Sequence, residues 1–210
     1  MHDLKNLIAQ QSLMVQNAAK HKGNPAFFED AMATLDNSVA RMNKLLQQLQ
    51  SGETAGPRQR VRVAAAAADA IERCRSREPV AELVDESEDL HVWIDRERLT
   101  AVLAHLIRNA QEATERDGHV TVRLALADGG VVIEVGDDGC GMEPEFVRER
   151  LFRPFDTTKG SKGMGIGAYQ ARTFVVEAGG SLRVESAPGQ GTRVAIQLPV
   201  QDPGTAMPIP

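Results

Sequence analysis

The chain has 210 residues, with 24 Lys and Arg against 29 Asp and Glu, which gives a formal net charge of −5. This balance, without a long basic tract, argues against nucleic acid as a partner. Cys74 and Cys140 are the only cysteines and have no metal-ligand spacing, which indicates a reducing cytoplasm. No apolar run approaches membrane-spanning length and no signal peptide pattern follows Met1. We therefore expect a soluble, cytoplasmic chain that makes no membrane contact itself.

Two helical patterns open the sequence. The first runs from about residue 3 to 21 and ends at the turn signal 23–25. The second repeats apolar residues at spacings of three and four, as a heptad seam does. These residues are Met32, Leu35, Val39, Met42, Leu46 and Leu49. A lone hairpin of two such helices buries too little apolar surface, so we predict that residues 1–51 form a homodimeric four-helix bundle rather than merely cover a second domain.

The rest of the sequence indicates a domain of strands and helices that lies between two polar segments. Residues 52–60 are rich in Gly and Pro and predict a linker, and residues 201–210, with three prolines, predict a disordered tail. Residues 138–162 lack periodicity and predict a mobile lid. Between them, strands are expected at 61–63, 80–84, 91–94, 120–127, 131–136, 181–185 and 192–198, with helices at 64–75, 95–116 and 169–178. The fold class is therefore α+β, a helical hairpin followed by an α/β two-layer sandwich over residues 61–200.

An acidic residue and two glycines follow one predicted strand. Asp137 closes the apolar run 131–135, and Gly139 and Gly141 come directly after it. A carboxylate at a strand end can accept a hydrogen bond from an exocyclic amine such as that of adenine. Glycines let the backbone pass close to a flat ring because they have no Cβ.

A second glycine cluster precedes the helical pattern at 168–178. It consists of Gly163, Gly165 and Gly167. Free N–H groups at the start of this helix would face phosphate. Together the two clusters predict a nucleotide site.

These clusters belong to a series of five motifs. In order, residues 105–113, 137–142, 151–159, 163–167 and 189–192 resemble the N, G1, F, G2 and G3 boxes of one ATP-binding domain. Histidine kinases, type II topoisomerases, the Hsp90 chaperone and mismatch-repair ATPases share that domain. The resemblance implies a Bergerat ATP-binding fold for residues 61–200, with ATP and Mg²⁺ as cofactors.

The resemblance also implies a set of ATP-binding residues. They are Asn109, Asp137, Gly139, Gly141, Thr157, Thr158, Lys159, Gly163, Gly165, Gly167 and Thr192. The amide oxygen of Asn109 can ligate Mg²⁺ while leaving room for phosphate oxygens. Lys159 with its two neighbouring threonines would neutralise and orient the transferring group.

Two positions depart from the pattern of relatives. Hydrolysing members carry a glutamate one turn before the asparagine, and here His105 stands there, which favours transfer to a protein acceptor. Histidine kinases often carry a basic residue three positions after the asparagine, where this chain has Glu112. Arg108 and Lys159 are candidates to supply the missing positive charge.

The first residues, 2–6, resemble the H box of histidine kinases. That resemblance implies that His2 attacks the γ-phosphorus, that Asp3 takes its proton, and that Asn6 orients water for dephosphorylating a partner. With the hairpin, the segment is similar to PrsK-like kinases of exosortase and exopolysaccharide systems, which implies a membrane-anchored parent protein.

We therefore expect the catalytic core of a bacterial sensor histidine kinase, with the receiver domain of a response regulator as partner. Three alternatives stay open: a nucleotide-binding dimeric scaffold, an ATPase of the same superfamily, and a serine kinase of the anti-sigma type.

Overall fold

The structure, a computed structural model, describes residues 32, 34, 56–86, 89–127, 129–154, 156 and 165–200. The chain divides into two compact units, residues 1–54 with 154–164 and residues 55–153 with 165–210. Met32 and Thr34 are helical. The remainder of the predicted hairpin, its dimer and the predicted tail lie outside the described residues. The account below therefore concerns the second unit.

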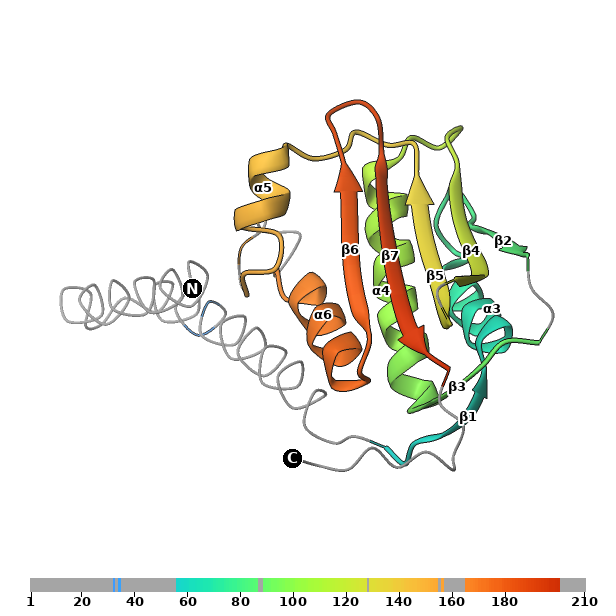
Figure 1. The fold of residues 1–210 in the computed structure, drawn as a ribbon. Coiled ribbons are helices and arrows are strands. Elements are labelled where there is room, and N and C mark those ends of the chain that lie inside the picture. The colour runs from blue at the N-terminus through green and yellow to red at the C-terminus, as the bar shows by residue number, and fades with distance from the viewer. Residues whose placement is uncertain are drawn as a thin grey trace, which may run out of the picture. The chain divides into compact units, whose positions relative to one another are not determined.

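A five-stranded mixed sheet with strand order β2-β4-β5-β7-β6 forms the centre of this unit (Figure 1). The strands are β2 (Glu82–Asp85), β4 (Val120–Ala127), β5 (Gly130–Asp137), β6 (Ser181–Ser186) and β7 (Thr192–Pro199). Only β2 and β4 pair in parallel, and β4 and β5 form the predicted hairpin. Alternate residues of β4, such as Val122 and Leu124, are fully buried, as expected for a sheet with one covered face.

Three helices cover that face of the sheet (Figure 1). They are α3 (Val63–Cys74), α4 (Arg96–Ala113) and α6 (Gly167–Glu177). Leu99, Leu103 and Ile107 of α4 are fully buried against the sheet core, and burial of each such side chain stabilises the fold by about 1.5–3 kcal/mol. The predicted α/β two-layer sandwich is confirmed. Among the described residues, no helix is long and apolar enough to cross a membrane.

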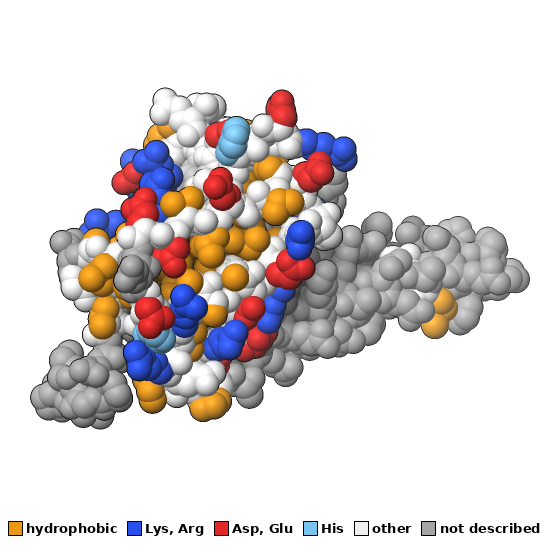
Figure 2. Space-filling model, turned by 90° about the vertical axis from the view of Figure 1, so that its right-hand side faces the viewer, with side chains coloured by type: hydrophobic (Ala, Val, Ile, Leu, Met, Phe, Trp, Pro, Cys, Tyr) orange, Lys and Arg blue, Asp and Glu red, His pale blue; other side chains and the backbone are white. Residues whose placement is uncertain are grey.

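A small sheet lies beside α3. It pairs β1 (Gln59–Arg62) with β3 (His91–Ile94) in antiparallel fashion. Figure 2 shows the side of the unit on which α3, β2 and β3 lie, where hydrophobic side chains gather at the centre and charged ones surround them. Ala68 of α3 is exposed, as is Val80.

Asp95 fixes the start of α4. This buried carboxylate accepts a hydrogen bond from the backbone N–H of Arg98 (3.1 Å), which caps the helix, and another from the N–H of Gly56 (2.6 Å). Glu97 in the first turn also complements the helix dipole.

Helix α4 ends at Ala113, three residues before its predicted end at 116. Thr114 leaves the helical conformation, and its hydroxyl donates to the carbonyl of Ala110 (2.8 Å). A hydroxyl that bonds to the backbone competes with continuation of the helix, so the predicted extension was wrong.

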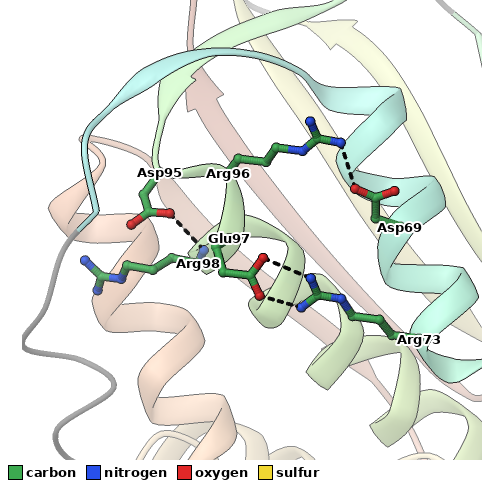
Figure 3. A network of polar contacts seen from close by, with 6 residues as sticks. All are labelled: Asp69, Arg73, Asp95, Arg96, Glu97 and Arg98. Atoms are coloured by element: carbon green, nitrogen blue, oxygen red, sulfur yellow. Dashed lines mark hydrogen bonds and ion pairs between the residues drawn. The ribbon is translucent and has the colours of Figure 1, made fainter.

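Ion pairs join α3 to α4 on the surface (Figure 3). Arg73 donates two hydrogen bonds to the carboxylate of Glu97 (2.7 and 2.9 Å), and Arg96 pairs with Asp69 (2.8 Å). The hydrogen bond from Arg73 lowers the pKa of Glu97, and the same bond raises the pKa of Arg73. These four residues are called the α3–α4 ion pairs below.

Gln111 holds the end of α3 from the opposite helix. It is 3% exposed, and its amide N–H₂ donates to the carbonyls of Cys74 (3.2 Å), Arg77 (2.9 Å) and Pro79 (2.9 Å). These carbonyls belong to the last residue of α3 and to the segment after it, and that of Cys74 also accepts from the N–H of Arg77 (3.2 Å). The two hydrogens of one buried amide are therefore shared among three backbone acceptors, of which those of Arg77 and Pro79 are the nearest.

The segment predicted as a lid at 138–162 is a helix in part. Helix α5 (Pro144–Glu149) begins with a proline in its first turn, a position that suits proline because its missing N–H is not needed there. None of its residues is buried, so it has no apolar periodicity to reveal it. Residues 157–164 lie outside the described residues.

Candidate functional site

Asp137 is the last residue of β5, and it is half-buried. Its Oδ1 accepts a hydrogen bond from the backbone N–H of Gly139 (3.0 Å). A side chain bound to its own backbone two residues on forms a tight local turn. This turn orients the carboxylate at the carboxyl end of the strand.

Residues 139–142 and 186–192 are bound to each other, and we call the pair the glycine clasp. Gly191 donates from its N–H to the carbonyl of Gly139 (3.1 Å), and Gly189 donates to the carbonyl of Cys140 (2.8 Å). Because Asp137 lies opposite Thr192 in the ladder of β5 and β7, two predicted site residues far apart in sequence are cross-strand neighbours.

Ser186 closes the clasp with its side chain. Its Oγ accepts from the N–H of Met142 (2.8 Å), donates to the carbonyl of Gly191 (2.9 Å) and lies 3.0 Å from Oγ1 of Thr192. Sequence reasoning missed this residue. Its only signal was its position at a strand end, directly before a turn.

Glycine is required at two positions of the clasp. Gly141 has φ +66° and Gly191 has φ +73°, in the left-handed region that other residues rarely adopt. A Cβ on Gly141 would overlap the carbonyl of Ala187, and one on Gly191 would overlap the carbonyl of Asp137. The backbone approaches itself too closely here for any side chain.

Helix α4 lies against the clasp near its end. The N–H of Cys140 donates to the carbonyl of Ala113 (3.0 Å), and a Cβ on Gly139 would overlap that same carbonyl. Asn109 is half-buried and lies one turn before Ala113 on the helix, so the backbone of these two residues is about one helical pitch apart.

The second glycine cluster meets the same stretch of α4. Gly165 has φ +64°, and Gly167 is the first residue of α6, with Ile166 as an N-cap that offers no side-chain hydrogen bond. A Cβ on Gly167 would overlap the ring of His105, one turn before Asn109. The start of α6 therefore packs directly on α4 at His105, one turn before Asn109.

Seven predicted site residues lie among the described residues, and two of them, Gly139 and Gly167, pack directly on the second half of α4. The seven are Asn109, Asp137, Gly139, Gly141, Gly165, Gly167 and Thr192. The other predicted site residues lie outside the described residues. These are His2, Asp3, Asn6, Thr157, Thr158, Lys159 and Gly163.

A metal ion could be held only in part by protein at this site. Among the described residues, no three His, Cys, Asp or Glu side chains gather in a way that could bind one. Mg²⁺ commonly takes one or two protein oxygens and completes its shell with water and substrate phosphates. The single amide oxygen of Asn109 fits that pattern.

Two charged contacts flank the site. Glu112, which departs from the pattern of histidine kinases, pairs with Arg77 at 3.2 Å, so it links α4 to the segment after α3. Asp138 accepts from the N–H of His119 (2.8 Å) and lies 3.0 Å from its ring Nδ1. The backbone hydrogen bond, followed by the ring contact, lowers the pKa of Asp138.

Comparisons with known proteins point to one group. A family model described as "Histidine kinase-, DNA gyrase B-, and HSP90-like ATPase" matches residues 94–202. Histidine protein kinase DivJ of Caulobacter vibrioides is 39% identical over 116 residues, which cover 53% of this chain and 19% of DivJ. C4-dicarboxylate transport sensor protein DctB of Rhizobium meliloti is 42% identical over 106 residues, 50% of this chain and 17% of DctB.

A solved structure agrees with these relatives. Mycobacterial sensor histidine kinase MprB superposes with a TM-score of 0.61 at 26% identity, over 68% of this chain and 97% of that chain. The match spans only 19% of DivJ and 17% of DctB, so both relatives are much longer than this chain.

Proposed function

Because the chain belongs to the histidine kinase-, DNA gyrase B- and HSP90-like ATPase family, we propose that it is the catalytic core of a bacterial sensor histidine kinase. The observation that carries the proposal is the convergence of Asn109, Asp137 and the two glycine clusters on one stretch of α4. The relatives DivJ and MprB, both named as histidine kinases, support the choice within the family.

The nucleotide would bind between the glycine clasp and the start of α6. Asp137 would accept a hydrogen bond from the adenine amine, and the glycines that follow it leave space for the ring. The first N–H groups of α6 would face the phosphates. Mg²⁺ would be held by Asn109 together with phosphate oxygens and would neutralise their charge.

The reaction we propose is phosphoryl transfer to histidine. A ring nitrogen of His2 attacks the γ-phosphorus of ATP, and the new N–P bond forms as the bond to the β–γ bridging oxygen breaks. ADP leaves, and Asp3 accepts the imidazole proton. Thr157, Thr158 and Lys159 would orient the transferring group.

The phosphoryl group would then pass to an aspartate carboxylate of a response regulator. Asn6 would orient water for the reverse signal, dephosphorylation of that regulator. A homodimer formed through residues 1–51 would present the His2 of each protomer to the regulator. The proposal extends only to the part of a longer signalling protein that this chain matches.

His105 supports transfer rather than hydrolysis. It occupies the position, one turn before Asn109, at which hydrolysing members carry the glutamate that activates water. Its ring lies against Gly167 at the start of α6. A packed imidazole in place of a carboxylate favours a protein acceptor over water.

The test is incubation with γ-labelled ATP and Mg²⁺, followed by assay for acid-labile, alkali-stable label on the protein. We expect His2→Ala and Asn109→Ala to abolish labelling, and the matched control His21→Ala to retain it. Steady phosphate release without labelled protein would contradict the proposal in favour of an ATPase. Nucleotide binding with neither label nor release would contradict it in favour of a scaffold.

A further inference from the structure

The ring of His105 occupies the space in front of Gly167. The three atoms that a Cβ on Gly167 would meet first are Nε2, Cε1 and Cδ2, all from this one imidazole. His105 is half-buried on α4, and Gly167 opens α6. The first residue of α6 therefore packs against the side chain of His105 on α4.

The backbone does not explain why residue 167 is glycine. The described glycines with positive φ are Gly129, Gly141, Gly165, Gly179, Gly189 and Gly191, and Gly167 is not among them. Glycine is also a poor helix former, about 1 kcal/mol worse than alanine per residue. The His105 ring is the feature that excludes a side chain there.

A second contact fixes the other end of α6. Arg98 pairs with Glu177 at 2.8 Å, and its guanidinium lies 4.9 Å from the centroid of the Phe174 ring. Arg98 precedes His105 by seven residues, and Phe174 follows Gly167 by seven residues. Seven residues make about two helical turns, so both contacts lie on the same faces of two antiparallel helices.

We propose that His105 is a positioning residue that sets the gap between α4 and the first turn of α6. Arg98 fixes one end of α6 and His105 sets the distance at the other end. Since Asn109 lies one turn beyond His105, this gap is the width of the site between the amide that would hold Mg²⁺ and the N–H groups that would face phosphate. The idea that this gap holds nucleotide rests on the proposed function. The role of His105 in spacing α4 and α6 does not.

The test is a double-variant cycle of Gly167→Ala and His105→Ala. Binding of a non-hydrolysable ATP analogue with Mg²⁺ is measured by calorimetry for the original chain, both single variants and the double variant. We expect Gly167→Ala to weaken binding about tenfold, a typical effect of overpacking. The double variant should bind more tightly than Gly167→Ala, because the small side chain at 105 leaves room for the new methyl group. It should bind more tightly than His105→Ala as well, because that single variant has an empty space where the ring set the gap.

The matched control is Gly139→Ala, whose Cβ would meet the backbone carbonyl of Ala113. His105→Ala should not rescue that variant. The proposal would be overturned if the double variant bound no better than Gly167→Ala, because glycine 167 would then serve the ligand itself. Unchanged binding in Gly167→Ala would also overturn it, since the ring would have moved aside without cost.

Thermal unfolding of the same four proteins without nucleotide separates the two proposals. Gly167→Ala should lower the Tm by about 2–4 °C, with recovery in the double variant. If the original chain failed to bind the analogue, the proposed function would fail while the unfolding cycle still decided the spacing. If Gly167→Ala did not fold, the proposal would be tested by folding itself. Recovery of folded protein in the double variant would then support it.

Discussion

The glycine clasp and the α3–α4 ion pairs both hold separate segments together, by different means. The clasp joins residues 139–142 to 186–192 through backbone hydrogen bonds and glycines that no other residue can replace. The ion pairs join two helices through exposed ends of long side chains. Backbone contact at Gly139, Gly141 and Gly191 leaves no room for an added atom, whereas solvent already competes for the ion pairs. We therefore expect the effects of substitution to fall steeply from one region to the other.

The largest effect is expected for Gly141→Ala in the clasp. A left-handed backbone costs a residue with a Cβ about 1–2 kcal/mol, and the overlap with the Ala187 carbonyl adds about 1–3 kcal/mol. Denaturant unfolding should show the loss, and nucleotide binding should disappear. The control is Gly129→Ala, which has φ +72° but no atom within 4 Å of its Cβ, and should lose only the backbone part. Equal losses in both variants would show that close backbone contact is not what distinguishes the clasp.

The second-largest effect is expected for Gln111→Leu. This variant shows whether a buried side chain contributes as much to the free energy of unfolding as the backbone contacts of the clasp. It removes the side-chain donor of the Arg77 and Pro79 carbonyls, at a cost of about 2–3 kcal/mol. Denaturant unfolding of the variant and the original chain measures this loss of unfolding free energy. The exposed Gln59→Leu should change stability by less than about 0.5 kcal/mol. A loss below 1 kcal/mol for Gln111→Leu would mean that water replaces the amide.

Ser186→Ala should have a smaller effect, although it lies in the clasp. The variant loses one side-chain link to Met142, Gly191 and Thr192 while the backbone hydrogen bonds remain. We expect a loss of about 1 kcal/mol in unfolding free energy and weaker nucleotide binding by about threefold to tenfold. The exposed Ser181→Ala on the same strand serves as control. Unchanged nucleotide binding would show that the side chain of Ser186 does not contribute to the binding site.

The smallest effect is expected for Glu97→Gln in the ion pairs, at less than about 1 kcal/mol. Since the folded-state pKa of Glu97 is lowered, its stabilisation is complete above the usual glutamate pKa and is lost as pH falls through the lowered value. The difference between the variant and the original chain should therefore shrink as the pH falls below the usual glutamate pKa, and vanish once the pH is below the lowered folded-state pKa. Unfolding curves across this range, with Glu82→Gln as control, measure it. A difference that persisted at low pH would mean that packing, not charge, joins these helices.

The sequence predicted the elements best where alternation or helical periodicity was strong. The strands 91–94 and 120–127 were predicted to the residue, because their side chains alternate between a buried and an exposed face. Helix α5 was missed because none of its residues is buried. The end of α4 was misplaced because a single hydroxyl at Thr114 decided it.

The site was predictable in its glycines and acids but not in its connections. Asp137 and Gly141 stand out because of their order along the chain. The contacts of Ser186 with Met142 and of Gln111 with Cys74 join residues more than 30 positions apart, and only the folded sheet and helices set their distance. The ring of His105 against Gly167 is of the same kind. Local patterns predict which residues a site needs, while tertiary packing decides what holds them.

Asp95 has a dynamic consequence beyond its role as a cap. One oxygen of this carboxylate holds the first turn of α4, and the other holds the amide of Gly56. Rotation of one side chain would release both groups together, so we expect the amides of Gly56 and Arg98 to show the same free energy of opening in hydrogen exchange. The segment at Gly56 and the first turn of α4 should thus open as one unit.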